Sequence, residues 1–535
     1  MERDGDPQHY DAIVVGAGFG GMYSLYRLRE RGLSVRVLEA GKDVGGTWYW
    51  NRYPGARCDV ESMEYSYSFS DELQQEWEWT ERYAAQPEIL RYAEHVADRF
   101  ELRKDIQFDT RVTGATWDED STSWLVRTES GATLRAAFIV WATGCLSVPN
   151  LPRIDGLDDF KGGVYHTGRW PHDEVDFRGR RVGVIGTGSS AIQAIPMIAE
   201  QGAELYVFQR QPNYSVPANN RPLDPGVQQA VKKDYKALRD DNLRQPGGFG
   251  SKLQRRSVSV FEESPAERER EFEKRWHMGG FAFLAGYGDL LRDEEANQYA
   301  AAFVRRKIHE IVEDPAVADL LSPHHIIGCR RLCVDTDYYR TFNRPNVHLV
   351  DVATNPIGRI TRQGVVVDDE EYPLDDIILA TGFDAMTGAL LRIDIQGRAG
   401  VSIQEKWRDG PKAYLGMTIA GFPNMFTING PGSPSVLSNM ITAIEQNVDW
   451  IDECIAYMRE KDHGVVEADP EAEADWAECV KELADGFLYG GCNSWWSGSN
   501  IEGKPRSFMA YVGFPQYVER CNEVVESGYA GFRFG

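Results

Sequence analysis

Glycines near the start of the chain are spaced in a way that suits the binding of a diphosphate group. Gly16, Gly18 and Gly21 form a G-x-G-x-x-G pattern directly after the apolar run of residues 12–15. Glycine at these positions allows a tight turn, a close approach of the backbone to a phosphate, and close packing of a helix against a strand. Helical spacing follows the pattern, so the N–H groups of the first helical turn would point at the anion.

An acidic residue completes this pattern. A second strand over residues 34–38 leads to Glu39, and a carboxylate at this point can bond the hydroxyl groups of a ribose. Strand, glycine loop, helix and acid together predict a β-α-β unit that holds an adenine dinucleotide. The alternative is a glycine turn in an ordinary α/β domain.

A second unit of the same kind lies further along the chain. Gly186, Gly188 and Ala191 form G-x-G-x-x-A after another apolar strand. The position that corresponds to Glu39 is Gln209, and Arg210 follows it. A neutral side chain followed by arginine favours a ribose that carries a 2′-phosphate. We therefore expect FAD in the first unit and NADPH in the second, unless Arg210 is only a surface charge.

Two nucleotide sites in one chain indicate electron transfer from nicotinamide to flavin. Apolar strands that end in Ala-Thr-Gly at residues 142–144 and 380–382 fit places where the chain crosses between two domains. The sequence thus predicts an α/β protein with two Rossmann-like dinucleotide-binding domains. The expected divisions are an FAD domain of residues 1–146 and 384–535, and an NADP domain of residues 147–383 with a helical insertion, a lid or spacer, at about 217–325.

The composition excludes several kinds of partner. The 535 residues include 58 Lys and Arg against 82 Asp and Glu, a net charge of −24, which opposes binding to nucleic acid or to an anionic membrane. No apolar run approaches the roughly 20 residues of a membrane-spanning helix. The eight cysteines include no C-x-x-C pair, so neither a metal site nor a dithiol centre is expected. Reduced thiols and a cytoplasmic location are the simplest expectation.

The segment between the two units has a specific pattern. Residues 160–171 match F-x-G-x-x-x-H-x-x-x-W-P at every defined position. With this pattern the chain resembles the type I Baeyer–Villiger monooxygenases over nearly its whole length. Residues 45–59, GGTWYWNRYPGARCD, and residues 430–435, GPGSPS, are most similar to the phenylacetone and steroid monooxygenase branches. The resemblance implies that His166 helps to couple the domains and that Trp170 serves packing; from the residues alone, His166 is a structural histidine.

The resemblance also implies a reaction. Members of this family use FAD and NADPH to insert one atom of dioxygen into a ketone through a flavin peroxide, which gives an ester or a lactone, and sulfoxidation is an expected side activity. The implied partners are a small-molecule ketone and dioxygen. Two alternatives stay open: a flavin monooxygenase that hydroxylates nitrogen or sulfur, which typically has another aromatic residue in place of Trp170, and a redox sensor without turnover.

Arg331 is the catalytic residue that the resemblance implies. It stands in the run C-R-R-L-C, where the family usually has Lys-Arg and this chain has Arg330 before it. A fixed guanidinium would stabilise first the peroxide anion and then the oxyanion on the substrate, because it does not readily give up its proton. Asp59 is the expected partner that orients Arg331. From the residues alone, the arginines are a surface pair and Asp59 caps a loop.

The remaining site residues are carried over from the family one by one. Cofactor contacts are expected at Gly16, Gly18, Gly20, Gly21, Glu39, Thr47, Trp48, Tyr49, Trp50, Arg57, Cys58, Asp59, Tyr65, Val112, Gly186, Thr187, Gly188, Ser189, Ser190, Ala191, Arg210, Gln211, Arg330, Arg331, Met440 and Trp495. The expected substrate pocket consists of Val60, Leu146, Pro434, Ser435, Val436, Leu437 and Met440. No metal site is expected.

Overall fold

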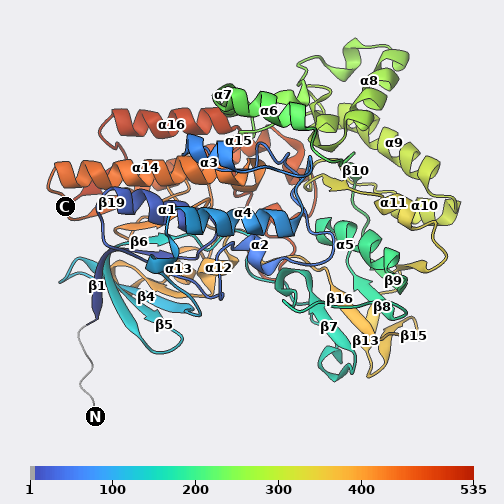
Figure 1. Cartoon of the computed structure of the whole chain (residues 1–535), viewed down its shortest axis with the longest axis horizontal. Helices are drawn as coiled ribbons and strands as arrows, with labels where there is room; N and C mark the ends of the chain where they lie inside the picture. The colour runs from blue at the N-terminus through green and yellow to red at the C-terminus, as the bar shows by residue number, and fades with distance from the viewer. Residues whose placement is uncertain (1–6) are drawn as a thin grey trace.

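Both dinucleotide-binding units are present, each in its own sheet (Figure 1). The computed structural model describes residues 7–535. In the first unit, β1 (Gln8–Val15) leads into α1 (Phe19–Glu30), and β2 (Val35–Leu38) pairs with β1 in parallel. In the second unit, β8 (Arg181–Ile185), α5 (Ser189–Glu200) and β9 (Glu204–Gln209) have the same arrangement. The predicted α/β fold with two Rossmann-like units is confirmed.

The first sheet is built on β1, whose alternating side chains enter two different cores. Ala12 and Val14 pack with α1 and α14 (Met440–Glu460), while Ile13 and Val15 pack on the opposite face, as the two-residue period of a strand requires. The strand order is β17-β4-β5-β6-β1-β2-β3, and β18 also pairs with β6. The other strands of this sheet are β3 (Ile106–Gln107), β4 (Val112–Asp118), β5 (Ser123–Thr128), β6 (Thr133–Trp141), β17 (Asp394–Gln396) and β18 (Met425–Thr427).

The second sheet is entirely parallel and is covered on both faces. Val182 and Val184 pack against α5, and Ile185 packs into a separate cluster on the other face. Burial on both faces accounts for the continuous apolar run of β8. Its order is β12-β9-β8-β16-β7, with β7 (Gly163–His166), β12 (Val347–Asp351) and β16 (Asp376–Leu379) as the added strands.

The expected helical insertion leaves and re-enters the second unit on two adjacent strands. β10 (Ser215–Pro217) pairs in parallel with β11 (Cys333–Asp335). Between them the chain forms the helices drawn in green to yellow-green from the top centre to the upper right of Figure 1. These helices are α6 (Pro225–Lys233), α7 (Tyr235–Leu243), α8 (Pro265–Met278), α9 (Glu294–Ile311) and α10 (Pro315–Leu321).

The remaining elements complete the cover of the two sheets. The helices are α2 (Thr47–Trp50), α3 (Asp71–Glu76), α4 (Gln86–Arg99), α11 (Tyr338–Thr341), α12 (Gly388–Leu391), α13 (Ile403–Lys406), α15 (Pro470–Asp485) and α16 (Phe514–Glu526). The strands are β13 (Ile357–Ile360), β14 (Gly364–Val367), β15 (Glu370–Pro373), β19 (Val466–Ala468) and β20 (Phe532–Phe534). Among the helices of residues 7–535, none has both the length and the apolar character to cross a membrane.

Two expectations from the sequence need correction. Residues 45–59 show neither helical nor strand periodicity, which predicts one long loop, but α2 makes one helical turn inside them. The cysteines are not all reduced: Cys329 and Cys492, which are 163 positions apart in sequence, form a disulfide with Cα atoms 6.0 Å apart. The sequence gives no spacing signal for a bridge between such distant positions.

Candidate active site

The first glycine loop lies at the carboxyl end of β1 and leaves no space for side chains. Gly16 has a φ of 104°, and a Cβ atom there would lie 2.6 Å from the carbonyl oxygen of Ala142. A Cβ atom on Gly21 would lie 1.8 Å from the carbonyl oxygen of Gly16. Gly18 is the N-cap of α1, and it has no side chain to cap the helix. The first N–H groups of α1 are therefore available to a diphosphate, and the loop fits the predicted dinucleotide.

Glu39 fixes this glycine loop from the end of β2. Its buried carboxylate accepts hydrogen bonds from the N–H groups of Ala17 and Gly41, each at 2.6 Å. Burial raises the pKa of Glu39, and these backbone hydrogen bonds act against the rise. The carboxylate stands where the sequence predicts a ribose contact, and that contact stays a prediction.

The second glycine loop has the same form at the carboxyl end of β8. Gly186 has a φ of 114°, and a Cβ atom there would lie 2.5 Å from the carbonyl oxygen of Ala380. Gly188 is the N-cap of α5 and provides no side-chain cap. Thr187 donates its hydroxyl to the carbonyl oxygen of Gln211 at 2.7 Å. The loop is thereby joined to the segment that follows β9.

Two arginines gather beside the second loop. Arg210 is exposed directly after β9, and Arg330 donates Nη2 to Oε1 of Gln211 at 2.6 Å. Burial lowers the pKa of Arg330, and the nearby charge of Arg210 lowers it further. Within residues 7–535, neither arginine has a carboxylate partner within salt-bridge distance. Two neighbouring cations without a counterion favour an anion such as the predicted 2′-phosphate.

Gln209 adds no negative charge at this position. It is buried at the end of β9, and its Nε2 donates to the carbonyl oxygen of Leu320 at 2.7 Å. The environment therefore differs in sign from that of Glu39 in the first unit, as the sequence predicts.

Arg331 and Asp59 form a bidentate ion pair between the two units. Nε donates to Oδ2 at 2.9 Å and Nη2 donates to Oδ1 at 2.8 Å. Nη1 donates to the carbonyl oxygen of Val436 at 2.8 Å. Burial alone would lower the pKa of Arg331, but the charge and hydrogen bonds of Asp59 outweigh it and raise the pKa above its usual value. The guanidinium is therefore charged and held in one orientation.

The return of the insertion determines where Arg331 lies. Residues 329–331 come immediately before β11, and the pairing of β11 with β10 holds them beside the second glycine loop. The hydroxyl of Ser189, at the start of α5, lies 3.3 Å from the sulfur of Cys333. This contact joins Cys333, two residues after Arg331, to α5 of the second unit.

Phe281, in the insertion, lies against Arg331. Its ring centre is 5.1 Å from the guanidinium carbon, a distance that allows a cation–π interaction. Together with Val60, Phe249 and Leu253, Phe281 also lines a small cavity beside Asp59. Neither phenylalanine is predicted from the sequence, because the charged helical pattern of the insertion contains no signal for a site.

Most of the predicted pocket residues meet in one apolar cluster. Leu146, Val436, Leu437 and Met440 pack together with Trp495 and Trp496. Pro434 and Ser435 are buried in the turn before Val436. Val60 lies apart from this cluster, in the cavity beside Asp59. The substrate contacts of all these residues stay predictions.

Residues 45–59 connect the two units. Tyr53 donates its hydroxyl to Oε1 of Gln193 on α5 at 2.8 Å. Gly55 has a φ of 83°, and a Cβ atom there would lie 2.2 Å from the carbonyl oxygen of Gln193. The backbone of this segment therefore lies directly against the backbone of α5.

The other predicted cofactor residues lie at helix starts, at strand ends or in the connecting segment. Gly20 and Gly21 lie in the first turn of α1, Ser189, Ser190 and Ala191 begin α5, Thr47, Trp48, Tyr49 and Trp50 make up α2, Val112 begins β4, and Met440 begins α14. Tyr65 accepts a hydrogen bond from the indole of Trp48 at 3.1 Å, Arg57 pairs with Glu81, and Cys58 is buried.

His166, in the segment between the two units, is held by hydrogen-bond contacts to neighbouring protein groups. Nδ1 of His166 accepts a hydrogen bond from the N–H of Gly168 at 2.9 Å, and Nε2 lies 3.3 Å from the hydroxyl of Thr381. Burial lowers the pKa of His166 to about 4, so the ring is neutral near pH 7. Trp170 is buried against Tyr165, which agrees with the predicted packing role.

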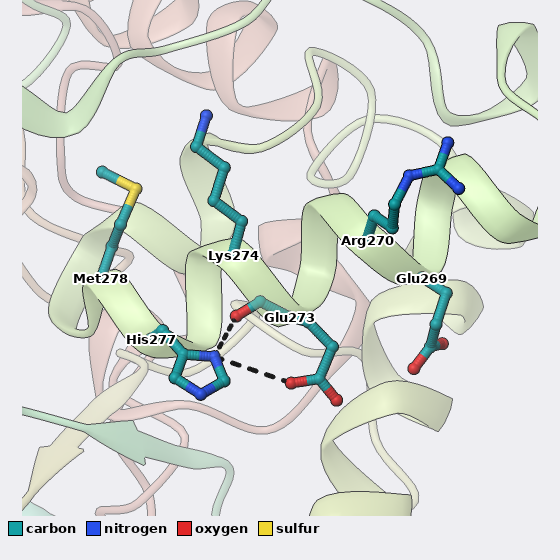
Figure 2. Close-up of a pocket in the computed structure, with 6 residues that line it drawn as sticks. All are labelled: Glu269, Arg270, Glu273, Lys274, His277 and Met278. Atoms are coloured by element: carbon teal, nitrogen blue, oxygen red, sulfur yellow. Dashed lines mark hydrogen bonds and ion pairs between the residues drawn. The ribbon is translucent and has the colours of Figure 1, made fainter.

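A second hollow lies on the outer face of α8 (Figure 2). Its carboxylates Glu269 and Glu273 pair with Arg306 and Lys307 of α9, and His277 lies beside Glu273. These charges are satisfied by contacts between and along the helices, so the hollow contributes no site.

Comparison with known proteins agrees with this arrangement. Residues 13–243 match the family described as pyridine nucleotide-disulphide oxidoreductase. A Baeyer-Villiger monooxygenase of Pseudooceanicola batsensis is 42% identical over 97% of this chain and 95% of its own length. A phenazine N-monooxygenase, PhzNO1, of Lysobacter antibioticus is 41% identical over 99% of this chain and 98% of its own.

Solved structures extend the similarity to three dimensions. The structure described as oxidized steroid monooxygenase bound to NADP has a TM-score of 0.94 and 51% identity, over 98% of this chain and 99% of that one. Cyclohexanone monooxygenase from Rhodococcus sp. Phi1, bound to NADP+, has a TM-score of 0.96 and 41% identity, over 99% of each chain. The predicted resemblance is confirmed, and the chain belongs to the family of type I Baeyer–Villiger monooxygenases.

Proposed function

We propose that this chain is an FAD-dependent, NADPH-consuming Baeyer–Villiger monooxygenase that converts a ketone to an ester or a lactone with one oxygen atom of dioxygen. Sulfoxidation of sulfides is proposed as a side activity. The observation that carries the proposal is the bidentate ion pair that Arg331 forms with Asp59. Bound FAD, reduced by NADPH, supplies the activation of dioxygen.

Arg331 would act where negative charge develops on oxygen. Its guanidinium keeps its proton, so it stabilises an oxyanion without protonating it. Asp59 fixes the plane of the guanidinium through two parallel hydrogen bonds. Phe281 covers the guanidinium at 5.1 Å and would exclude water from that side.

The cofactors would be held by the two glycine loops. Gly16, Gly18 and the first turn of α1 would bind the diphosphate of FAD, with Glu39 near the adenosine ribose. The corresponding loop at Gly186 would bind NADPH, and the cation pair Arg210 and Arg330 would hold its 2′-phosphate. The apolar cluster around Val436 and Leu437 would contact the ketone.

Oxidation of nitrogen is the second candidate function. It is favoured by the phenazine N-monooxygenase from Lysobacter antibioticus, which is 41% identical to this chain. Incubation of the enzyme with a ketone, a tertiary amine, and no substrate separates the candidates. Ester from the ketone supports the first proposal, N-oxide without ester supports the second, and NADPH consumption without either product contradicts both.

The purified protein is expected to be yellow and to contain about one non-covalent FAD per chain. The open N-terminus of α1 and the buried Glu39 form a site for an adenine dinucleotide. Heat or acid should release the flavin into the supernatant, where chromatography identifies it. Release of FMN, or retention of the flavin on the denatured chain, would contradict the assignment.

We further propose a cytoplasmic location and the domain division expected from the sequence, with residues 1–146 and 384–535 around the first sheet and residues 147–383 around the second. Six of the eight cysteines carry free thiols, which supports the location. Cell fractionation tests it, and recovery of the protein in an exported or membrane fraction would contradict it.

A further inference from the structure

Three consecutive residues, Cys329, Arg330 and Arg331, together contact three different parts of the molecule. Cys329 is bridged to Cys492. Arg330 donates Nε to the carbonyl oxygen of Asn493 at 3.0 Å, and it also donates Nη2 to Oε1 of Gln211, in the segment after β9. Arg331 binds Asp59 of the first unit. The segment that carries the proposed catalytic residue therefore also holds the chain near residue 492.

The chain around Cys492 belongs to a long connection between α15 and α16, which we name the C-terminal loop (residues 487–509). Its only helical elements are two short turns, Leu488–Gly491 and Trp495–Ser497. Away from the two arginines, hydrogen bonds of Leu488, Asn500 and Lys504 hold this loop, and Trp496 and Met509 pack into the apolar cluster around Val436. A loop with so little regular secondary structure opens more readily than a packed helix or strand.

We propose that the Cys329–Cys492 disulfide is a reducible tether that positions the C-terminal loop, with Trp495, against the Arg330–Arg331 segment. This inference rests on the proposed function, in which Trp495 belongs to the coenzyme site and Arg331 to the site of oxygen transfer. Cys329 and Cys492 are positioning residues: neither contacts the reacting atoms. A tether raises the effective concentration of one attached segment beside the other, so the loop stays closed for a larger fraction of the time.

The difference in exposure between Cys329 and Cys492 determines which of the two sulfurs a reductant attacks first. Cys329 is buried, with 1% of its surface exposed, whereas Cys492 is half-buried. A thiolate of a dithiol reductant would therefore attack the sulfur of Cys492. The bond between the two cysteine sulfurs would break, and Cys329 would leave as a thiolate and take up a proton. The second thiolate of the reductant then displaces Cys492, which also takes up a proton, and the reductant leaves as a cyclic disulfide.

Loss of the tether should weaken coenzyme binding more than it slows chemistry. If the loop must close to hold NADPH, the apparent affinity falls in proportion to the closed fraction. Neither cysteine takes part in the hydrogen bonds between Arg331 and Asp59, so we expect this ion pair to persist without the bridge once coenzyme is saturating. The expected signature is a raised KM for NADPH with a nearly unchanged rate of flavin reduction.

The first experiment tests the tether itself and needs no substrate. Peptide mapping of the FAD-loaded enzyme without reductant should yield the Cys329 and Cys492 peptides joined. Trypsin should then cut after the exposed Arg506 of the C-terminal loop at least about tenfold faster once dithiothreitol has opened the bridge, since cleavage follows the population of the open loop. Separate peptides, or equal cleavage rates before and after reduction, would overturn the proposal.

The second experiment uses Cys492→Ser with Cys479→Ser as the matched control. Cys479 is a free, half-buried cysteine on α15, outside the C-terminal loop. Cys492→Ser should raise the KM for NADPH roughly fivefold if the closed fraction falls to about a fifth, and dithiothreitol should have no further effect. Reduced wild type should behave like Cys492→Ser, and Cys479→Ser like untreated wild type.

The outcomes separate this inference from the proposed function. If wild type makes no ester but the joined peptide and the trypsin response are present, the function is wrong and the tether stands. If ester forms and Cys492→Ser keeps the wild-type KM and trypsin rate, the function stands and the positioning role is wrong.

Discussion

Replacement of Arg331 by alanine is expected to abolish ester formation while NADPH still reduces the flavin. Hydride transfer requires the nicotinamide close to the flavin, whereas oxygen insertion requires a stabilised negative charge on oxygen. Loss of one preorganised donor of this kind typically costs about 3–4 kcal/mol of barrier, or roughly 10²–10³ in rate. Dioxygen that the variant consumes should appear as hydrogen peroxide.

The measurement combines anaerobic stopped-flow reduction of the flavin with aerobic product yield. Arg331→Lys is the informative companion variant. It should restore little ester, because an ammonium lacks the planar fork that binds both oxygens of Asp59 and loses its proton more readily. Ester formation by Arg331→Ala at near the wild-type rate would show that another residue is catalytic.

Replacement of Arg210 by alanine is expected to reduce the preference for NADPH over NADH roughly 10- to 100-fold. Arg210 and Arg330 form a cation pair beside the second glycine loop, and Gln209 adds no negative charge there. Loss of one charge-assisted contact to a phosphate costs about 1.5–3 kcal/mol. NADH has no 2′-phosphate, so its KM should change little.

The preference is measured as the ratio of kcat/KM for the two coenzymes. Arg178→Ala is a suitable control, because this exposed arginine belongs to the same domain but pairs with Asp176. It should leave the ratio unchanged. An equal loss for NADPH and NADH in Arg210→Ala would mean that Arg210 does not contact the 2′-phosphate.

The two nucleotide-binding units could be predicted from the sequence because their signals are local. Each unit has its glycines, its apolar strand and the residue after the second strand within one short stretch, and the backbone conformation at Gly16 and Gly186 requires glycine. The same register pairs the acidic Glu39 with the neutral Gln209, which Arg210 follows. These features depend on neighbouring residues and not on the packing of distant ones.

The pairing of Arg331 with Asp59 could be anticipated only through the family resemblance. Two arginines in a row are usual on a surface, and 272 positions separate the partners. The same limit explains why Phe281 and the Cys329–Cys492 bridge were not predicted. Each depends on how the insertion or the C-terminal loop folds back, and no local pattern contains that information.

The contact at Gly55 has a consequence for the construction of hybrid enzymes. The backbone of residues 45–59 lies so close to α5 that even a methyl group at residue 55 would meet the carbonyl oxygen of Gln193. A second unit taken from a relative must therefore place the helix that corresponds to α5 at the same distance and angle from residues 45–59, whatever side chains that helix carries. Hybrids should be designed by matching the path of this helix before matching the residues around Arg331, because a displaced helix would separate the units.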